Sequence, residues 1–146
     1  TMLISPRGYI RIGKASHIST NVLICGHKGV QMGNFCGLGS GTKIYSTSES
    51  YTGEGISNLN LINIRKFNKY SKFDEGKVVI NDHTNIGANC TILPKTFIGK
   101  NSSIGANSVI KNIIKGGFIY FGYPLKPIIK KSKKNLEIEK KIKKNL

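Results

Sequence analysis

The chain has 146 residues, enough for one domain with its own hydrophobic core. Its 23 lysines and arginines outnumber 7 aspartates and glutamates. The resulting formal net charge of +16 fits either an anionic partner, such as a nucleotide or a phosphate, or a solvated lysine-rich tail, and the second interpretation is favoured for the lysines at the end of the chain. The sequence contains no signal peptide and no long apolar run, which argues against membrane insertion and predicts a cytoplasmic location.

Apolar residues recur at a spacing of six through most of the chain. In the first half they form two sets of three: Ile12, Ile18 and Ile24, then Met32, Leu38 and Ile44. In the second half they run without a slip through Ile80, Ile86, Ile92, Ile98, Ile104 and Ile110. A period of six fits neither a helix nor plain strand alternation, and such a repeat predicts a solenoid of short strands and tight corners.

Three hexads closing one turn would form a triangular coil of about eighteen residues, so the chain would contain about four coils. The apolar residues would point inward and stack in columns, each preceded at minus two by a small or β-branched residue. Cys36 and Cys90 occupy such inward positions and are expected to be small core residues. Together with Cys25 they form no C-x-x-C motif, so a zinc or redox site is not expected.

Two interruptions of the repeat fall on the same edge of the predicted prism. One is the expanded corner at 25–29, and the other is a long insertion at 45–77. Solenoids carry insertions on their binding side, and long loops on rigid scaffolds usually carry function, so the site is expected at this edge. The chain is also expected to leave the prism there, at Lys111-Asn112.

The chain is expected to divide into a β-helix domain, residues 1–128, and a lysine-rich tail, residues 129–146. Residues 135–146 could form a short helix with Leu136, Ile142 and Leu146 loosely on one side. Because the apolar face is weak and the lysines are dense, a frayed tail is expected rather than a membrane anchor.

Two stretches of the sequence resemble the hexapeptide-repeat acyltransferases. They are Ile98-Gly-Lys-Asn-Ser-Ser-Ile-Gly-Ala-Asn-Ser-Val-Ile110 and Phe121-Gly-Tyr-Pro-Leu-Lys-Pro-Ile128. The chain is similar in particular to sugar O- and N-acetyltransferases of the maltose and galactoside type, including surface-polysaccharide enzymes, over nearly all of residues 8–130. The resemblance implies an all-β fold, a left-handed parallel β-helix of about four triangular coils. It also implies a homotrimer with acetyl-CoA in a groove between neighbouring prisms.

The resemblance places a catalytic histidine five residues after the last hexad position before the insertion, but Glu49 stands there. A carboxylate would need burial to act as an effective base near neutral pH. His17 comes one residue before an inward position, so it is expected to point outward, free to face a neighbouring subunit's loop. We therefore expect His17 or Glu49 to accept the proton that the attacking hydroxyl or amine of the acceptor loses. An amine that binds in its neutral form would need less help from a base.

The resemblance and the position of the insertion also suggest residues for the two substrates. Acceptor contacts are expected at Ser19, His27, Tyr51 and His83. Contacts with acetyl-CoA are expected at Ala88, Gly105, Ala106, Lys111, Asn112 and Lys126. Small residues would let the pantetheine arm approach backbone amides, and the two lysines would meet the phosphates.

These observations predict a CoA-dependent acetyltransferase that acts on a hydroxyl or amine of a sugar or nucleotide-linked sugar. The alternative is a non-catalytic β-helix scaffold or a ligand-binding relative, because the usual loop histidine is absent. A metal site is not expected, since the three histidines lie on different faces or corners. Nucleic-acid binding is not expected either, since no recognition motif or aromatic platform is present. Relatives often carry more chain before the first coil, so an acceptor-binding segment could precede Tyr9.

Overall fold

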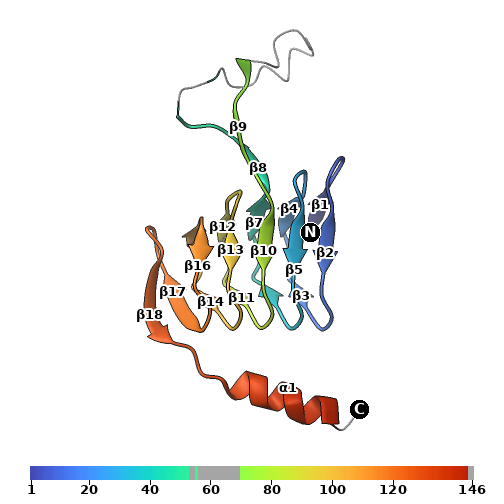
Figure 1. Cartoon of the computed structure of the whole chain (residues 1–146), viewed down its shortest axis with the longest axis vertical. Coiled ribbons are helices and arrows are strands. Elements are labelled where there is room, and N and C mark those ends of the chain that lie inside the picture. Colours follow the sequence, from blue (N-terminus) through green and yellow to red (C-terminus); the bar gives the residue numbers. More distant parts are fainter. Residues whose placement is uncertain (53–54, 56–69, 145–146) are drawn as a thin grey trace.

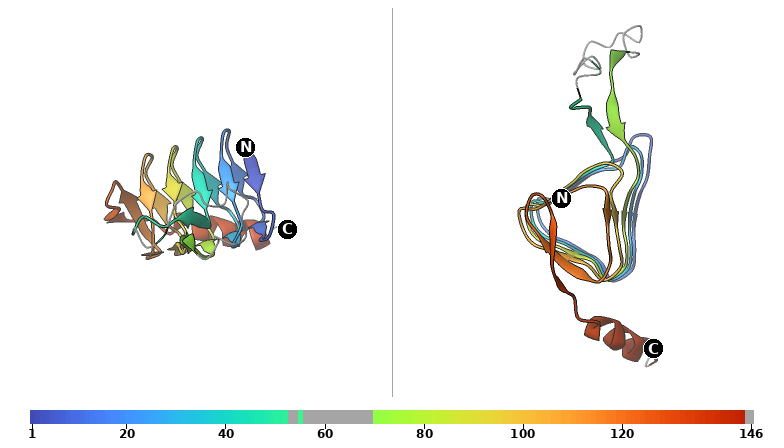
Figure 2. Two further views of the ribbon diagram at one scale, coloured as in Figure 1. Left: turned by 90° about the horizontal axis from the view of Figure 1, so that it is seen from above. Right: turned by 60° about the vertical axis from the view of Figure 1, so that its left-hand side comes forward.

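The structure is a computed structural model that describes residues 1–52, 55 and 70–144. The chain winds into a parallel β-helix whose coils stack along one axis (Figure 1) and are triangular in cross-section (Figure 2). Two features project from this prism. A two-stranded arm leaves one edge, and a C-terminal helix lies beyond another (Figure 2).

Three sheets, here called A, B and C, form the faces of the prism. Sheet A contains β1 (Met2–Ile4), β4 (Leu23–Cys25), β7 (Lys43–Tyr45), β12 (Thr91–Ile92) and β15 (Val109–Ile110). Sheet B contains β2 (Ile10–Ile12), β5 (Val30–Met32), β10 (Val78–Ile80), β13 (Phe97–Ile98) and β16 (Ile113–Ile114). Sheet C contains β3 (His17–Ile18), β6 (Gly37–Leu38), β11 (Asn85–Ile86), β14 (Ser103–Ile104), β17 (Phe118–Phe121) and β18 (Lys126–Lys130).

Columns of inward side chains form the core, as the hexad spacing predicts. Ile44, Ile92 and Ile110 stack on one another across sheet A and are completely buried. From Val22 onward, the residues two positions before the hexad apolar residues are buried as well, including Thr84 and Cys90. Ile12 departs from the prediction and remains 42% exposed, because β2 is the terminal strand of sheet B and no further coil covers it.

The β-helix extends beyond the four coils that the repeat predicts, at both of its ends. The four expected coils are present, but β1 precedes the first of them, and β16 and β17 continue beyond the fourth. The expectation that the chain leaves the prism at Lys111-Asn112 is therefore wrong. Ile114 stacks on Ile98 and Tyr120 on Ile104, so the last coil is shorter than eighteen residues, and its first inward residue follows Ile110 by four instead of six.

The corners between faces adopt positive φ angles, which most residues avoid. Nine non-glycine residues do so in the part of the chain that the structure describes, and five of them are asparagine, the residue type that tolerates this conformation best after glycine. The exceptions include Phe35 and His83, which stack with ring centroids 5.1 Å apart. Large side chains at corners therefore pack on those of the neighbouring coil.

The insertion at 45–77 forms an arm through β8 (Thr47–Glu49) and β9 (Phe73–Glu75), which pair in antiparallel fashion. Residues 53–54 and 56–69 of this insertion lie outside the described residues. Gly76 donates its backbone N–H to the carbonyl of Ser46, which closes the base of the arm against the prism.

The tail forms helix α1 (Lys134–Lys144), and the helix is docked rather than frayed, contrary to expectation. Glu139 on its prism-facing side contacts His83 Nε2 through a carboxylate oxygen at 2.5 Å. Lys143, and then His83, hold the pKa of Glu139 below its usual range. Lys131, just before the helix, donates through Nζ to the carbonyls of His83 and Ser102. The expected boundary between 128 and 129 falls inside β18, and residues 145–146 lie outside the described chain.

Candidate functional site

The interrupted corners lie together along the edge between sheets A and B, here called the A/B edge, as predicted. Acidic residues of the arm join three other corners of this edge, one before the arm and two after it. Glu75 Oε1 lies 2.8 Å from Lys28 Nζ, in the corner before the arm. Asp74 Oδ1 lies 2.8 Å from Lys95 Nζ, and Asp74 Oδ2 lies 3.2 Å from Lys111 Nζ, in the two corners after it.

The arm is held more strongly through Asp74 than through Glu75. The side chain of Asp74 is 19% exposed, whereas both partners in the Lys28–Glu75 pair are at least 40% exposed and lose more of their attraction to solvent. A hydrogen bond from Lys95 lowers the pKa of Asp74 most, and Lys111 lowers it further, against an opposing effect of burial. The Asp74 attachment is therefore intact at neutral pH and is lost only as pH falls through this lowered pKa.

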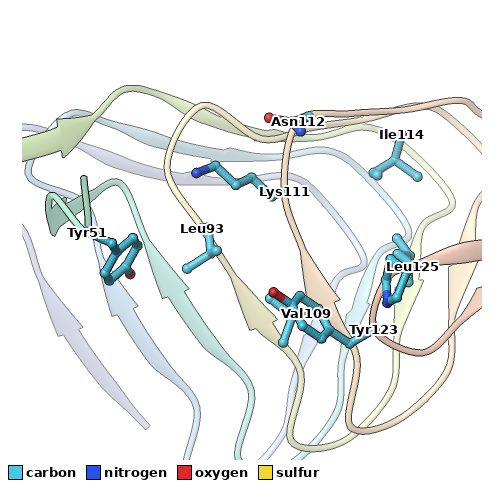
Figure 3. A pocket seen from close by; sticks show the side chains of 9 residues that line it. Tyr51, Leu93, Val109, Lys111, Asn112, Ile114, Tyr123 and Leu125 are labelled. Carbon is cyan, nitrogen blue, oxygen red and sulfur yellow. The ribbon is translucent and has the colours of Figure 1, made fainter.

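A groove here called the Lys111 groove runs over the outer face of sheet A near its C-terminal strands (Figure 3). It has a volume of 620 Å³, within the size range of small-molecule sites. Its walls include Val109 of β15, Leu93 directly after β12, Lys111 and Tyr123. Tyr51 reaches the groove from the arm (Figure 3). Tyr51 is 73% exposed, and its hydroxyl lies 2.9 Å from that of Ser48.

A second hollow, of 580 Å³ and here called the His27 hollow, lies at the other side of the arm's base. It is lined by Arg7, Cys25, His27, Lys28, Tyr45, Thr47, Phe73 and Glu75. The prism supplies its first residues and the two arm strands supply its last three. The hollow therefore exists only because the arm emerges next to the expanded corner at 25–29.

The groove and the hollow follow one another along a single outward column of sheet A. Cys25 pairs with Tyr45 in the hollow. The same register continues through Ile44, Ile92 and Ile110, so Leu93 and Lys111 of the groove follow in that column. Three strand spacings separate the first and last of these four residues, a span of about 14 Å. Two ligands bound there would lie end to end.

His17 and Ser19 lie on sheet C, away from the A/B edge. His17 is exposed, as predicted, and its neighbour in the next coil is Gly37, which leaves a shallow hollow over this part of the sheet. Ser19 Oγ lies 2.8 Å from Ser40 Oγ. Glu49 lies on β8 of the arm, opposite Phe73. Within one chain, the structure therefore does not bring the two predicted bases together.

His83 is placed differently from a surface substrate contact. It is only 5% exposed and lies at the corner between sheets B and C, between Phe35 and Glu139 of helix α1. This corner is separate from the A/B edge that carries His27. His83 therefore fastens the C-terminal helix within this chain, and the structure does not group it with the other predicted acceptor residues.

The residues expected to contact acetyl-CoA divide between two corners on either side of sheet A. Lys111 and Asn112 line the Lys111 groove. Ala88, Gly105 and Ala106 lie on the opposite corner, between sheets C and A. The ring of Phe121 covers Gly105, because an added Cβ there would lie 1.9 Å from it. Lys126 is exposed on β18 beside Leu125, which lines the groove.

None of the three cysteines suits an acyl-enzyme mechanism. Burial raises the pKa of the thiols of Cys25, Cys36 and Cys90 above the ordinary value. The thiolate is the reactive form, so the protonated thiols are poor nucleophiles. Among the described residues, no group of three or more histidine, cysteine or acidic side chains is placed to hold a metal ion. No described helix is long and apolar enough to cross a membrane.

Sequence reasoning missed Asp74, Arg7 and Tyr123 as parts of the site. Asp74 and Arg7 lie outside the hexads, where the repeat gives no position for a side chain. Tyr123 follows the unexpected additional coil and reaches the Lys111 groove from the turn between β17 and β18 (Figure 3). The lysines at three corners of the A/B edge, Lys28, Lys95 and Lys111, could have indicated that the arm carries acidic residues to pair with them.

Comparison with known proteins agrees with the repeat and the fold. Residues 77–112 match the family model for the bacterial transferase hexapeptide (six repeats). The chain is 33% identical over 132 residues to a dTDP-4-amino-4,6-dideoxy-D-glucose acyltransferase of Escherichia coli. The aligned part covers 90% of this chain and 66% of that relative, so the chain spans just under two thirds of the relative's length.

Solved structures show the same architecture. AntD, an N-acyltransferase from Bacillus cereus, in complex with dTDP and 3-hydroxybutyryl-CoA, has a TM-score of 0.87 at 28% identity, covering 99% of this chain and 72% of AntD. A serine-to-alanine mutant of AntD with dTDP-4-amino-4,6-dideoxyglucose and coenzyme A has a TM-score of 0.87 at 29% identity, covering 95% of this chain and 73% of the mutant. A hexapeptide-repeat acetyltransferase from Vibrio cholerae has a TM-score of 0.73 at 22% identity, covering 90% of this chain and 65% of the acetyltransferase. This similarity supports the fold alone. The predicted left-handed parallel β-helix is confirmed.

Replacing Asp74 by Asn should loosen the arm without unfolding the prism. The substitution removes the charge that holds Lys95 and Lys111, so backbone amides of β8 and β9 should exchange hydrogen for deuterium several-fold faster. Mass spectrometry of peptides from the arm and from sheet A measures this directly. Glu137→Gln on helix α1 is the matched control, since it removes one acid far from the arm. Equal exchange in the arm of all three proteins would show that Asp74 does not hold it.

Proposed function

We propose that the chain, whose residues 77–112 match the bacterial transferase hexapeptide family model, transfers an acyl group from a CoA thioester to the amine of a nucleotide-linked sugar. The observation that carries the proposal is the end-to-end arrangement of the Lys111 groove and the His27 hollow. Such a transfer needs two ligands whose reacting atoms meet, and the column of sheet A supplies two adjoining sites.

We assign the CoA thioester to the Lys111 groove. Its floor is apolar where Leu93 and Val109 lie, which suits a pantetheine arm. The ammonium of Lys111 would share its charge between Asp74, at 3.2 Å, and a CoA phosphate. Acetyl-CoA is the donor that we test first. The AntD complex contains 3-hydroxybutyryl-CoA, so a longer acyl group belongs in the same panel.

The reaction proceeds by direct attack. The acceptor nitrogen forms a C–N bond with the thioester carbonyl carbon, the C–S bond breaks, and CoA leaves as a thiolate that takes up a proton. The attacking amine loses one proton, either to a side chain or to solvent. The raised thiol pKa values of the cysteines argue against an acyl-enzyme step. An amine is favoured over a hydroxyl because the E. coli relative and AntD are named for an amino sugar and for N-acyl transfer.

We further propose a homotrimer in which sheet C of one subunit faces the arm of the next. His17 and Ser19 would then complete a site that Glu49 and Tyr51 approach from the neighbouring chain. The open surface over His17, produced by Gly37 and Gly39, leaves room for such a contact. This arrangement would bring together the two predicted bases, which lie apart within one chain.

The activity test mixes the protein with acetyl-CoA and a panel of dTDP-linked amino and hydroxy sugars, and measures release of free CoA thiol. We expect release with a 4-amino sugar. Lys111→Gln should raise KM for acetyl-CoA about tenfold, the effect of losing one charged phosphate contact. Lys100→Gln, which removes another aspartate-paired lysine with a partly exposed side chain, at the corner between sheets B and C, should leave KM unchanged. No thiol release with any acceptor and no CoA binding would favour a non-catalytic scaffold.

Mixed trimers test the base and the shared site together. If His17 and Glu49 of neighbouring chains act in one site, His17→Asn and Glu49→Gln should each lower kcat by roughly a hundredfold or more. Co-refolding the two variants should restore up to about one third of the wild-type rate, because one interface per mixed trimer keeps both side chains. Light scattering should give three times the 16.0 kDa mass of the chain. Unchanged rates in both single variants would indicate that the amine reacts without a protein base.

A further inference from the structure

We propose that the His27 hollow binds the nucleoside diphosphate part of the acceptor, with Arg7 and His27 on the phosphates and Tyr45 and Phe73 beside the base. The inference rests on the proposed function for the identity of the attached sugar. The binding site itself is argued from charge, aromatic lining and position on the prism.

The basic side chains of Arg7 and His27 line this hollow. Within the described part of the chain, neither the Arg7 guanidinium nor the His27 imidazole has a hydrogen-bond or ion-pair partner. Lys28 differs, because it is already paired with Glu75 at 2.8 Å. Arginine presents a planar fork that matches phosphate oxygens in pairs, and a second donor nearby suits a diphosphate. An anion entering the hollow would therefore gain two partners without breaking an existing pair.

Two aromatic side chains occur in the same hollow. Tyr45 ends β7 on the prism, and Phe73 begins β9 on the arm, so the rings come from the two opposing parts that form the hollow. Phe73 is 36% exposed although it lies at the base of the arm. The flat face of a nucleobase stacks on such rings, whichever of the bases it is. Aromatic and basic groups in one hollow fit a nucleotide better than a simple sugar.

The position of the hollow sets the direction of the ligand. Cys25 and Tyr45 of the hollow are followed in the same column by Leu93 and Lys111 of the groove. A nucleoside diphosphate held at Arg7 would therefore direct its attached sugar along the A/B edge toward the groove. The base of the arm, where Asp74 and Glu75 are fastened, lies between the two sites and would contact the sugar.

Coenzyme A also contains a nucleoside with phosphates, so both ligands must be tested. Isothermal titration calorimetry of the full chain with dTDP and, separately, with CoA gives both dissociation constants. Arg7→Gln should raise Kd for dTDP by about tenfold or more and leave Kd for CoA within about twofold. Phe73→Leu, which keeps an apolar side chain but removes the ring, should raise Kd for dTDP about fivefold.

Arg11→Gln is the matched control. It removes the same charge from an exposed arginine that lies over the ring of Tyr9, outside the hollow, and should change neither constant. The inference is overturned if Arg7→Gln leaves dTDP binding intact, if Arg11→Gln weakens it equally, or if Arg7→Gln weakens CoA instead. Failure of wild type to bind dTDP also overturns it, while thiol release with another acceptor would leave the transfer activity standing. Binding of dTDP without thiol release would instead contradict only the proposed function.

Discussion

The stacking of each coil on the one before it is the constraint on which the rest of the molecule depends. Parallel strands two to four residues long hydrogen-bond to the next coil, and the buried isoleucine columns hold these coils in register. Each fully buried side chain of this size contributes about 1.5–3 kcal/mol, so the columns far outweigh any surface contact. Because every turn repeats the same path, residues far apart in the sequence arrive at fixed intervals along one edge.

This regularity explains how an irregular arm can belong to a precise site. The arm's hydrogen-bonded base and its acidic residues fasten it to the A/B edge. Glu75 and Asp74 pair with lysines of the corner before the arm and of the two corners after it, which only stacked coils place in a row. Exposed ion pairs contribute little individually, but Asp74 is largely shielded and shared by two lysines. The prism therefore supplies rigidity and the arm supplies chemical variety, a common division between scaffold and loop.

Much of the fold was predictable because the core leaves a strict pattern in the sequence. The inward positions, the triangular coils and the common edge of the two interruptions follow from the spacing of Ile80 through Ile110. The last coil was missed because its step from Ile110 to Ile114 is four residues, so the repeat ends before the structure does. Ile12 was predicted to be buried, but it lies at an end of the prism where no coil covers it.

The site was less predictable because side chains at corners obey no period. His27 and the insertion were located through the breaks in the repeat, and the structure brings them into one hollow. His83 has a hexad-corner position much like any other, yet helix α1 covers it, a contact between residues 56 positions apart in the sequence. Pairing of Asp74 with Lys95 and Lys111 likewise joins separate coils, so neither contact leaves a local pattern in the sequence.

The most direct test of the account is a crystal structure of the protein with CoA and dTDP bound together. The account predicts the pantetheine arm along Leu93 and Val109, with its sulfur directed toward the His27 hollow. It also predicts the dTDP phosphates within hydrogen-bond distance of Arg7. The account would be contradicted by CoA lying along the corner of Ala88 and Ala106 with the Lys111 groove empty, or by dTDP bound on a different edge of the prism.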